Sequence, residues 1–339
     1  MGKSRTTMRD IADACGVSLS TVSLVLSNNP RISAPTRDKI WASVKKFGYQ
    51  PDIHARGLAL RRSKTLSVVV PDIEHVFADV YFGQIVSGIY DAATEQGYKI
   101  ILDVANERFV EAGEHLNVLR TRRVDGLLCV CASLDDTFLR DFEQEDFPFL
   151  EVNHYFPDSN LNYVATDYAD SARQAAKHLL DLGHRRIGLI TGTNVQTAIE
   201  FRACFEEACY RGGVEPQLPW ADGRFHQQGG FEAMESLLTQ NPDLTAIMAG
   251  NDKMAIGAMR YLLSKGLTVP DEISVMGVDD IPSAGFVTPG LTTIRHDLYA
   301  LGRQACRHIL DLIENRATHC REVLPVELIV RESTGPARA

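Results

Sequence analysis

From residue 65 onward the chain alternates short apolar runs with amphipathic helical segments, and this alternation limits the folds that it can adopt. Residues 65–71 and 124–132 are predominantly apolar, and a helical pattern over residues 82–96 follows the first of them. Apolar runs without a polar face are typical of parallel strands that helices cover on both sides. The pattern further predicts strands at 98–104, 149–153, 186–191, 220–222, 246–249 and 273–278, and helices at 113–122, 171–182, 201–211, 230–240 and 253–265.

The number of these elements predicts more than one sheet. The pattern predicts about ten strands over about 270 residues, which is more than a typical single sheet contains. The chain of 339 residues is long enough for two or three domains. We therefore expect an α/β core of two doubly wound lobes, each built on a parallel sheet.

The first fifty residues have a different, purely helical pattern. Two short helices, at 8–15 and 19–26, meet at a tight turn, Gly16-Val17-Ser18, in which Ser18 is a plausible N-cap. A third helix opens at Ser33 or Pro35 and stops at Gly48. This order is typical of a helix-turn-helix, whose second helix lies in the DNA major groove, although a generic three-helix bundle fits the same pattern.

The charge of the chain is distributed unevenly. Residues 1–64 hold twelve Lys and Arg and four Asp and Glu, a net charge of +8, whereas the remainder carries −17. A basic module gathers phosphate contacts, while an acidic body is repelled by DNA. The asymmetry favours nucleic-acid binding at the N-terminal end only.

Several functions are disfavoured by what the sequence lacks. The seven cysteines form no C-x-x-C pair, so we interpret them as packing residues and expect no metal site. No G-x-G-x-x-G follows a strand and no nucleophile–base pair stands out, which argues against a dinucleotide enzyme, a catalytic residue or a cofactor. No apolar run approaches the roughly 18 residues of a membrane span and no secretory h-region is present, so a cytoplasmic location is expected.

Residues 8–51 resemble the N-terminal domain of the LacI/GalR family of bacterial transcription regulators. The matching positions are Asp10-Ile11-Ala12, Gly16-Val17-Ser18, Thr21-Val22-Ser23, Thr36-Arg37 and Gly48-Tyr49-Gln50-Pro51. The resemblance implies a headpiece over residues 1–50 and a hinge helix over 51–63. It also implies double-stranded operator DNA as a partner.

The family's DNA contacts can be carried over position by position. Leu19, Ser20 and Leu24 match residues that read base edges, while Ser18, Thr21, Ser23 and Asn29 are better interpreted as phosphate contacts. In the hinge, Ala55, Arg56 and Leu58 match the family's x-A-R-x-L segment, with Leu58 as an apolar wedge in the minor groove. Two of the three base readers are leucine, which offers only apolar contact, for example to a thymine methyl.

Residues 65–335 resemble the sugar-binding core of the family, which has the fold of periplasmic binding proteins. The matching landmarks include Val124-Asp125-Gly126-Leu127, Gly250-Asn251-Asp252 and Gly277-Val278-Asp279-Asp280. The resemblance implies an effector-binding and dimerisation core over 64–335. It places one lobe at about 64–164 plus 293–324 and the other at about 165–292 plus 325–335.

The resemblance also implies which residues contact the effector. The matching positions are Tyr81, Phe82, Asn153, Arg202, Phe225, Asn251 and Asp279. Asp and Asn pair with sugar hydroxyls, Arg supplies a planar fork, and aromatic rings cover apolar sugar faces. Residues 74–79 make the segment before Tyr81 about four residues longer than is usual. Gln196 and Ala198 stand where purine-binding members have Arg and Thr, which argues against a purine.

These observations predict a transcriptional regulator, expected to be a repressor, that binds a palindromic operator as a homodimer under the control of a sugar-like effector. The alternative is a sugar-binding receptor without DNA regulation. The missing signal peptide and the basic N-terminal module oppose it.

Overall fold

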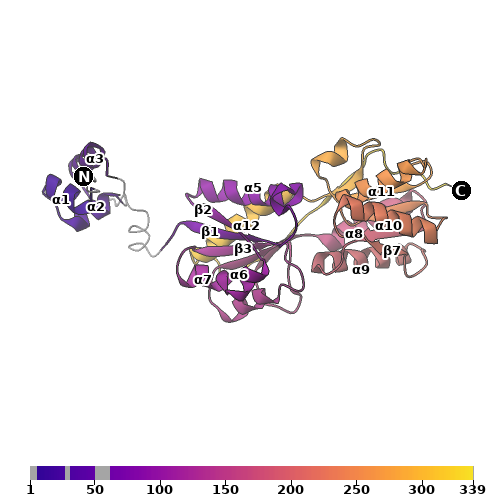
Figure 1. The fold of residues 1–339 in the computed structure, drawn as a ribbon, viewed down its shortest axis with the longest axis horizontal. Coiled ribbons are helices and arrows are strands. Elements are labelled where there is room, and N and C mark those ends of the chain that lie inside the picture. The colour runs from indigo at the N-terminus through magenta and orange to yellow at the C-terminus, as the bar shows by residue number, and fades with distance from the viewer. Residues whose placement is uncertain (1–5, 27–30, 50–61, 339) are drawn as a thin grey trace. The chain divides into compact units, whose positions relative to one another are not determined.

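The computed structural model describes residues 6–26, 31–49 and 62–338, and the chain divides into two compact units at Lys64 and Thr65 (Figure 1). The expected phosphate contact at Asn29 and the expected hinge residues Ala55, Arg56 and Leu58 lie outside the described residues. Within the described ranges, no helix is long and apolar enough to cross a membrane.

The N-terminal unit is a three-helix domain with its own core. Its helices are α1 (Met8–Cys15), α2 (Leu19–Leu26) and α3 (Ala34–Phe47). Thr7 and Asp10 form a capping box at the start of α1, and the Ser18 hydroxyl accepts from the backbone N–H of Thr21 at 3.1 Å, which confirms the expected cap on α2. Ile11, Val22 and Ile40 are fully buried where the three helices meet.

The second unit contains two six-stranded sheets, which define an N-lobe and a C-lobe. The N-lobe sheet has the order β11-β5-β4-β3-β1-β2 with every pair parallel. The C-lobe sheet has the order β12-β10-β9-β8-β6-β7, and only β12 runs antiparallel to its neighbour. The expected fold of two parallel-sheet lobes is therefore confirmed.

The strands and helices follow the chain as the alternation predicts. The N-lobe contains β1 (Thr65–Val70), η1 (Val76–Ala78), α5 (Val80–Glu95), β2 (Lys99–Val104), α6 (Glu107–Glu111), α7 (Glu114–Arg120), β3 (Gly126–Val130), η2 (Thr137–Gln144), β4 (Phe149–Val152), β5 (Tyr163–Thr166), α12 (Leu298–Ile313) and β11 (Arg321–Leu324). The C-lobe contains α8 (Tyr168–Asp181), β6 (Ile187–Thr191), α9 (Gln196–Arg211), β7 (Trp220–Asp222), α10 (Gln227–Gln240), β8 (Ala246–Ala249), α11 (Asp252–Ser264), β9 (Ser274–Asp279), η3 (Pro282–Gly285), β10 (Thr292–Arg295) and β12 (Glu327–Ile329).

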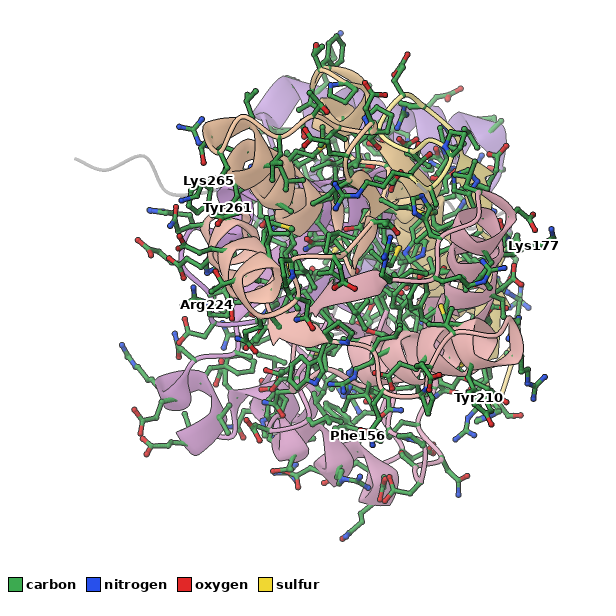
Figure 2. The ribbon with its side chains drawn as sticks, turned by 90° about the vertical axis from the view of Figure 1, so that its right-hand side faces the viewer. Phe156, Lys177, Tyr210, Arg224, Tyr261 and Lys265 are labelled. Atoms are coloured by element: carbon green, nitrogen blue, oxygen red, sulfur yellow. The ribbon has the colours of Figure 1, made fainter. Side chains whose placement is uncertain are left out.

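Helices cover both faces of each sheet, so the apolar strands are buried on both sides. In the N-lobe, α5 and α12 pack on one face and α6, α7 and η2 on the other. In the C-lobe, α8 and α9 cover one face and α10 and α11 the other. The outer helix faces carry exposed side chains such as Lys177, Tyr210 and Lys265, which point away from the body of the lobe (Figure 2).

Two glycines set the spacing of α5 and α12. A Cβ on Gly88 would lie 2.1 Å from the backbone oxygen of Tyr299, and a Cβ on Gly302 would lie 2.1 Å from that of Ile85. The two helix backbones therefore approach each other more closely than any larger side chain allows. This contact joins two helices that lie far apart in the sequence. The Tyr299 hydroxyl on α12, for example, donates a hydrogen bond to Asp91 on α5, a residue 208 positions earlier.

The chain crosses between the lobes three times, after β5, β10 and β11. The lobe boundaries expected at 164/165 and 292/293 differ from the sheets by a few residues. β5 belongs to the N-lobe sheet as far as Thr166, and β10 pairs with β9 in the C-lobe sheet as far as Arg295. Residues 293–295 thus lie in the C-lobe, because the ladder between β9 and β10 continues to the end of the strand.

Candidate functional site

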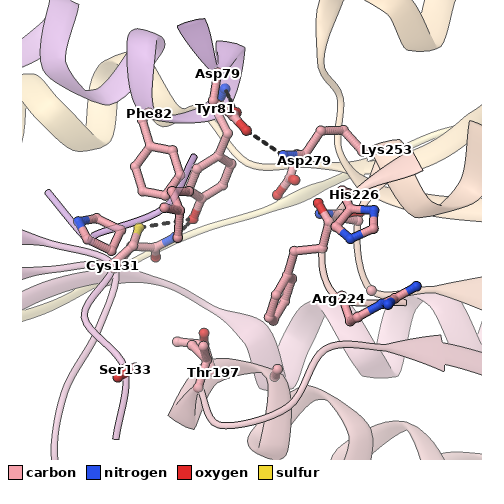
Figure 3. A pocket seen from close by; sticks show the side chains of 18 of the residues that line it. Asp79, Tyr81, Phe82, Cys131, Ser133, Thr197, Arg224, His226, Lys253 and Asp279 are labelled. Carbon is pink, nitrogen blue, oxygen red and sulfur yellow. Dashed lines mark hydrogen bonds and ion pairs between the residues drawn. The ribbon is translucent and has the colours of Figure 1, made fainter. Parts of the chain in front are cut away.

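A cavity of about 770 Å³ lies between the two lobes, where the carboxyl ends of the parallel strands meet (Figure 3). This edge is where ligands bind in doubly wound folds, and the volume is that of a small-molecule site. Six of the seven expected effector residues line it: Tyr81, Phe82, Asn153, Phe225, Asn251 and Asp279. The two lobes contribute three of these residues each.

Several lining residues that follow strands have left-handed backbone conformations. Cys131 after β3 has φ 53°, Asn153 after β4 has φ 57°, and Phe225 after β7 has φ 58°. Asp279, the last residue of β9, has φ 108°. Such conformations are uncommon outside glycine and concentrate at functional sites, because the surrounding structure must compensate for their strain.

Asn153 is the centre of a hydrogen-bond network on the N-lobe side of the cavity. Its amide nitrogen donates to the hydroxyls of Tyr81, at 2.5 Å, and Tyr168, at 3.0 Å, while its amide oxygen accepts from the Thr166 backbone N–H at 3.0 Å. The Cys131 thiol donates to the Tyr81 hydroxyl at 3.5 Å. Burial raises the pKa of Tyr81 well above its ordinary value, so the hydroxyl stays neutral and can both donate and accept.

Asp279 is the buried acid of the cavity. Burial raises its pKa well above the usual range and the nearby Asp252 carboxyl raises it further, while the Lys253 ammonium lowers it. The Oδ1 atom of Asp279 lies 3.6 Å from Nδ1 of His296, whose pKa burial lowers to about 3. The imidazole is therefore neutral at physiological pH and gives Asp279 no positive charge to pair with.

Asn251 has a mainly structural position at the cavity wall. Its side-chain oxygen caps α11 by accepting from the Met254 backbone N–H at 2.8 Å, and its amide nitrogen donates to the Phe225 carbonyl at 3.2 Å. The Phe225 ring packs on Gly192, where a Cβ would lie 1.9 Å from the ring. Asn251 thus fixes the loop that presents the aromatic wall.

Arg202, the seventh expected effector residue, does not reach the cavity. Its Nε donates to Glu206 on the same helix at 3.0 Å, and its guanidinium lies 4.1 Å from the centre of the Trp220 ring. The face of α9 that lines the cavity carries Ala198 and Phe201 instead. Arg202 lies in a separate, smaller depression of about 350 Å³.

An ion pair that the sequence did not predict joins the lobes across the cavity. The Lys253 ammonium, in the first turn of α11, lies 2.5 Å from Oδ2 of Asp79, and both side chains are mostly buried. The other carboxylate oxygen of Asp79 caps α5 by accepting from the Tyr81 backbone N–H at 2.9 Å (Figure 3). We call this pair the lobe clasp; Asp79 is the last residue of the extra segment at 74–79.

The lobes also touch on the side of the cavity near Ser133 and Thr197, opposite the lobe clasp (Figure 3). There the Leu134 backbone N–H donates to the Asn194 carbonyl at 3.0 Å, and the Asn194 amide donates to Asp135 at 2.5 Å. Contacts therefore bridge the two lobes on both of these sides of the cavity.

The candidate DNA-binding surface is the outer face of α2. Leu19, Ser20 and Leu24 are exposed there, while Thr21 and Ser23 are half-buried. Val22, Val25 and Leu26 face the core. Ser18 and Thr21 share a hydrogen bond of 2.9 Å between their hydroxyls at the start of the helix.

Among residues 6–26, 31–49 and 62–338, no three His, Cys, Asp or Glu side chains gather as a metal site requires. Each of the seven cysteines is a free thiol, and burial raises the pKa of Cys131 to about 12, which makes a reactive thiolate unfavourable.

Comparison with known proteins finds a matching family for each of the two units. A family described as "Bacterial regulatory proteins, lacI family" matches residues 7–52, and a "Periplasmic binding protein-like domain" matches residues 176–334. The HTH-type transcriptional repressor PurR of Haemophilus influenzae (strain PittEE) is 32% identical over 333 residues, covering 96% of this chain and 98% of the relative.

Two solved structures extend the likeness to the whole chain. The lac repressor dimer bound to operator and the anti-inducer ONPF superposes with a TM-score of 0.86 at 29% identity, covering 98% of this chain and all of the other. The complex of the regulator CelR with cellobiose gives 0.74 at 29% identity, covering 97% of this chain and all of the other. The chain belongs to the lacI family of bacterial regulatory proteins. It is a DNA-binding transcription regulator with a helix-turn-helix headpiece and a ligand-binding core.

Proposed function

We propose that this regulator is a repressor that binds a palindromic operator as a homodimer, and that a neutral sugar in the interlobe cavity controls it. The observation that carries the effector assignment is the set of buried hydrogen-bonding groups, Tyr81, Asn153 and Asp279, facing aromatic rings in one cavity. Paired hydroxyl contacts and a ring face are what a sugar requires. CelR, a relative of similar fold, has been solved with cellobiose.

The charges of the cavity favour a neutral ligand over a phosphorylated one. Its lining Arg and Lys side chains, Arg224 and Lys253, pair with the carboxylates of Glu232 and Asp79 respectively. A phosphate would have to compete with these carboxylates for a cation. Ala198, which lines the cavity, offers only a methyl group where purine-binding relatives have a hydroxyl, which disfavours a purine.

The headpiece supplies the DNA contacts of this proposal. Leu19, Ser20 and Leu24 face the bases, and Ser18, Thr21, Ser23 and Asn29 contact phosphates, while Ala55, Arg56 and Leu58 form the minor-groove hinge. Because one helix-turn-helix reads only a few base pairs, specific affinity requires two copies on a two-fold site. The lac repressor, a relative of similar fold, was solved as a dimer bound to operator, which supports this arrangement.

The effector assignment is tested by a thermal-shift screen of the full chain. Neutral mono- and disaccharides, cellobiose among them, are compared with the matching sugar phosphates and with purines. We expect a rise in Tm with at least one neutral sugar and none with its phosphate. A shift produced only by phosphates or purines would contradict the assignment.

The site itself is tested by Asp279→Ala. Removal of the buried carboxyl should weaken binding of the sugar identified above by roughly 100-fold, because each lost hydrogen bond is worth about 1–1.5 kcal/mol and two are expected to be lost. Calorimetric titration gives the Kd. Arg202→Gln is the matched control and should leave the Kd unchanged, since its side chain lies outside the cavity. An unchanged Kd in Asp279→Ala would move the site elsewhere.

The DNA function is tested by a salt titration. Affinity for duplex DNA should fall steeply as salt rises, because cations of the headpiece replace counterions at phosphates. Affinity for a selected palindrome should exceed that for random duplex at every salt concentration. Equal affinities would show that the headpiece does not read sequence.

A further inference from the structure

The outer face of α2 carries two exposed leucines. Leu19 is 41% exposed and Leu24 is 36% exposed, with the exposed Ser20 between them. Because an α-helix turns by about 100° per residue, the side chains of Leu19, Ser20 and Leu24 lie within an arc of about 140° around the helix axis. Three apolar residues of the same helix, Val22, Val25 and Leu26, already fill the headpiece core, so these two leucines are not needed there.

The chemistry of this face excludes the usual way of reading bases. Guanine and adenine are read by paired hydrogen bonds from Arg, Lys, Asn or Gln, and α2, from Leu19 to Leu26, contains none of these residue types. A leucine can make only apolar contact. In the major groove, the 5-methyl group of thymine is the apolar feature that one base pair presents and the others lack.

We propose that Leu19 and Leu24 read thymine 5-methyl groups, so that each operator half-site holds thymines at the positions below this face. The inference rests on the proposed function, because it assumes that α2 enters the major groove of an operator. The net charge of +8 on residues 1–64 supplies the attraction to phosphate that brings an apolar face against DNA. Selectivity then comes from burial of methyl groups and affinity from charge.

The experiment begins with the full chain and a random duplex library, from which the tightest palindrome is selected. Each thymine of a half-site is then replaced by deoxyuridine, which keeps base pairing and removes only the methyl. We expect the affinity to fall by roughly fourfold for each contacted methyl, the value of one buried methylene at about 0.8 kcal/mol. Fluorescence anisotropy at one fixed salt concentration gives the Kd.

Two variants show which leucine contacts which thymine methyl group. Leu24→Ala should weaken binding to the thymine duplex by a similar factor and show no further loss with deoxyuridine at the position that Leu24 contacts. Leu19→Ala should behave in the same way at a different position. Ser20→Ala is the matched control from the same face and should keep the full sensitivity to deoxyuridine. Since both leucines are exposed, the headpiece should fold in all three variants.

The outcomes separate the inference from the function on which it rests. A palindrome that is bound specifically but tolerates deoxyuridine at every thymine would overturn the inference and leave the proposed function standing. If no duplex is bound in preference to random DNA, the proposed function fails first. Methyl dependence that persists unchanged in Leu19→Ala and Leu24→Ala would assign the thymines to another element and also overturn the inference.

Discussion

Glu151→Gln is expected to stabilise the core by about 3 kcal/mol at pH 7. Glu151 lies on β4, is fully buried, and neither carboxylate oxygen has a hydrogen-bond partner among the described residues. Burial raises its pKa from 4.5 to about 8, and the Arg140 and Arg321 guanidinium groups lower it by less. The folded chain must therefore keep a proton that the unfolded chain releases.

The sign of this effect sets its pH dependence. Below pH 4.5 both states are protonated and the cost vanishes. As the pH rises from 4.5 to about 8, the unfolded state ionises first, so the folded protein loses stability at about 1.4 kcal/mol per unit. The glutamine variant does not titrate, and its advantage should grow over the same interval. The buried His154, whose pKa burial lowers from 6.5 to about 4, is present in both proteins, so its own pH dependence cancels from the difference between them.

Urea unfolding at pH 5, 6, 7 and 8 measures the difference between variant and wild type. Glu235→Gln is the matched control because this carboxylate is more than half exposed on α10, so the same substitution there removes no burial penalty and should change the free energy of unfolding little. A Glu151→Gln difference that stays constant from pH 5 to 8 would show that the carboxyl is already ionised in the folded protein. Glu151→Leu repeats the test without a buried amide.

The second large effect concerns the lobe clasp. Asp79→Asn and Lys253→Met should each destabilise the core, and together they should show a coupling free energy of about 1–2 kcal/mol in a double-mutant cycle, because the pair is mostly buried. Asn preserves the helix cap on α5, so that the loss reports the ion pair. Urea unfolding gives the free energies.

The control cycle uses Glu207 and Arg211, an ion pair on one exposed face of α9. Its coupling should be no more than about 0.5 kcal/mol. Hydrogen exchange adds a structural readout: the loops at 131–136 and 191–197, which contribute residues to the cavity, should exchange faster in Lys253→Met because the cleft opens more often. Equal coupling in the two cycles, with unchanged exchange, would mean that the clasp does not hold the lobes together.

The sequence indicated the fold because its signals are local. The strand at Ala246–Ala249 has the bounds that its apolar run predicts, and the strand at Trp220–Asp222 lies where the alternation of strands and helices places it. The predicted elements end at residue 278, and α12 (Leu298–Ile313) lies beyond them. Its apolar stripe, which includes Leu301, Ala305 and Ile309, carries a clear helical signal of its own.

The site was only partly predictable, because a sequence motif indicates where a residue lies in the fold but not where its side chain points. Tyr81, Asn153 and Asp279 follow strands whose ends must meet at one edge, so their convergence follows from topology. Arg202 lies on a helix, where its direction depends on packing against Trp220 and on the alternative partner Glu206. The lobe clasp depends on two residues 174 positions apart, and no local pattern pairs them.

The threefold crossing between the lobes has a consequence for biosynthesis. The N-lobe obtains its last helix and its edge strand from residues 298–324, after the C-lobe strands up to β10 have left the ribosome. Until then the face of α5 that receives α12 stays open to water, and contacts between such distant residues form slowly. Both sheets therefore lack their last strand until the end of translation, and a nascent chain halted before residue 298 would present the apolar face of α5 to chaperones.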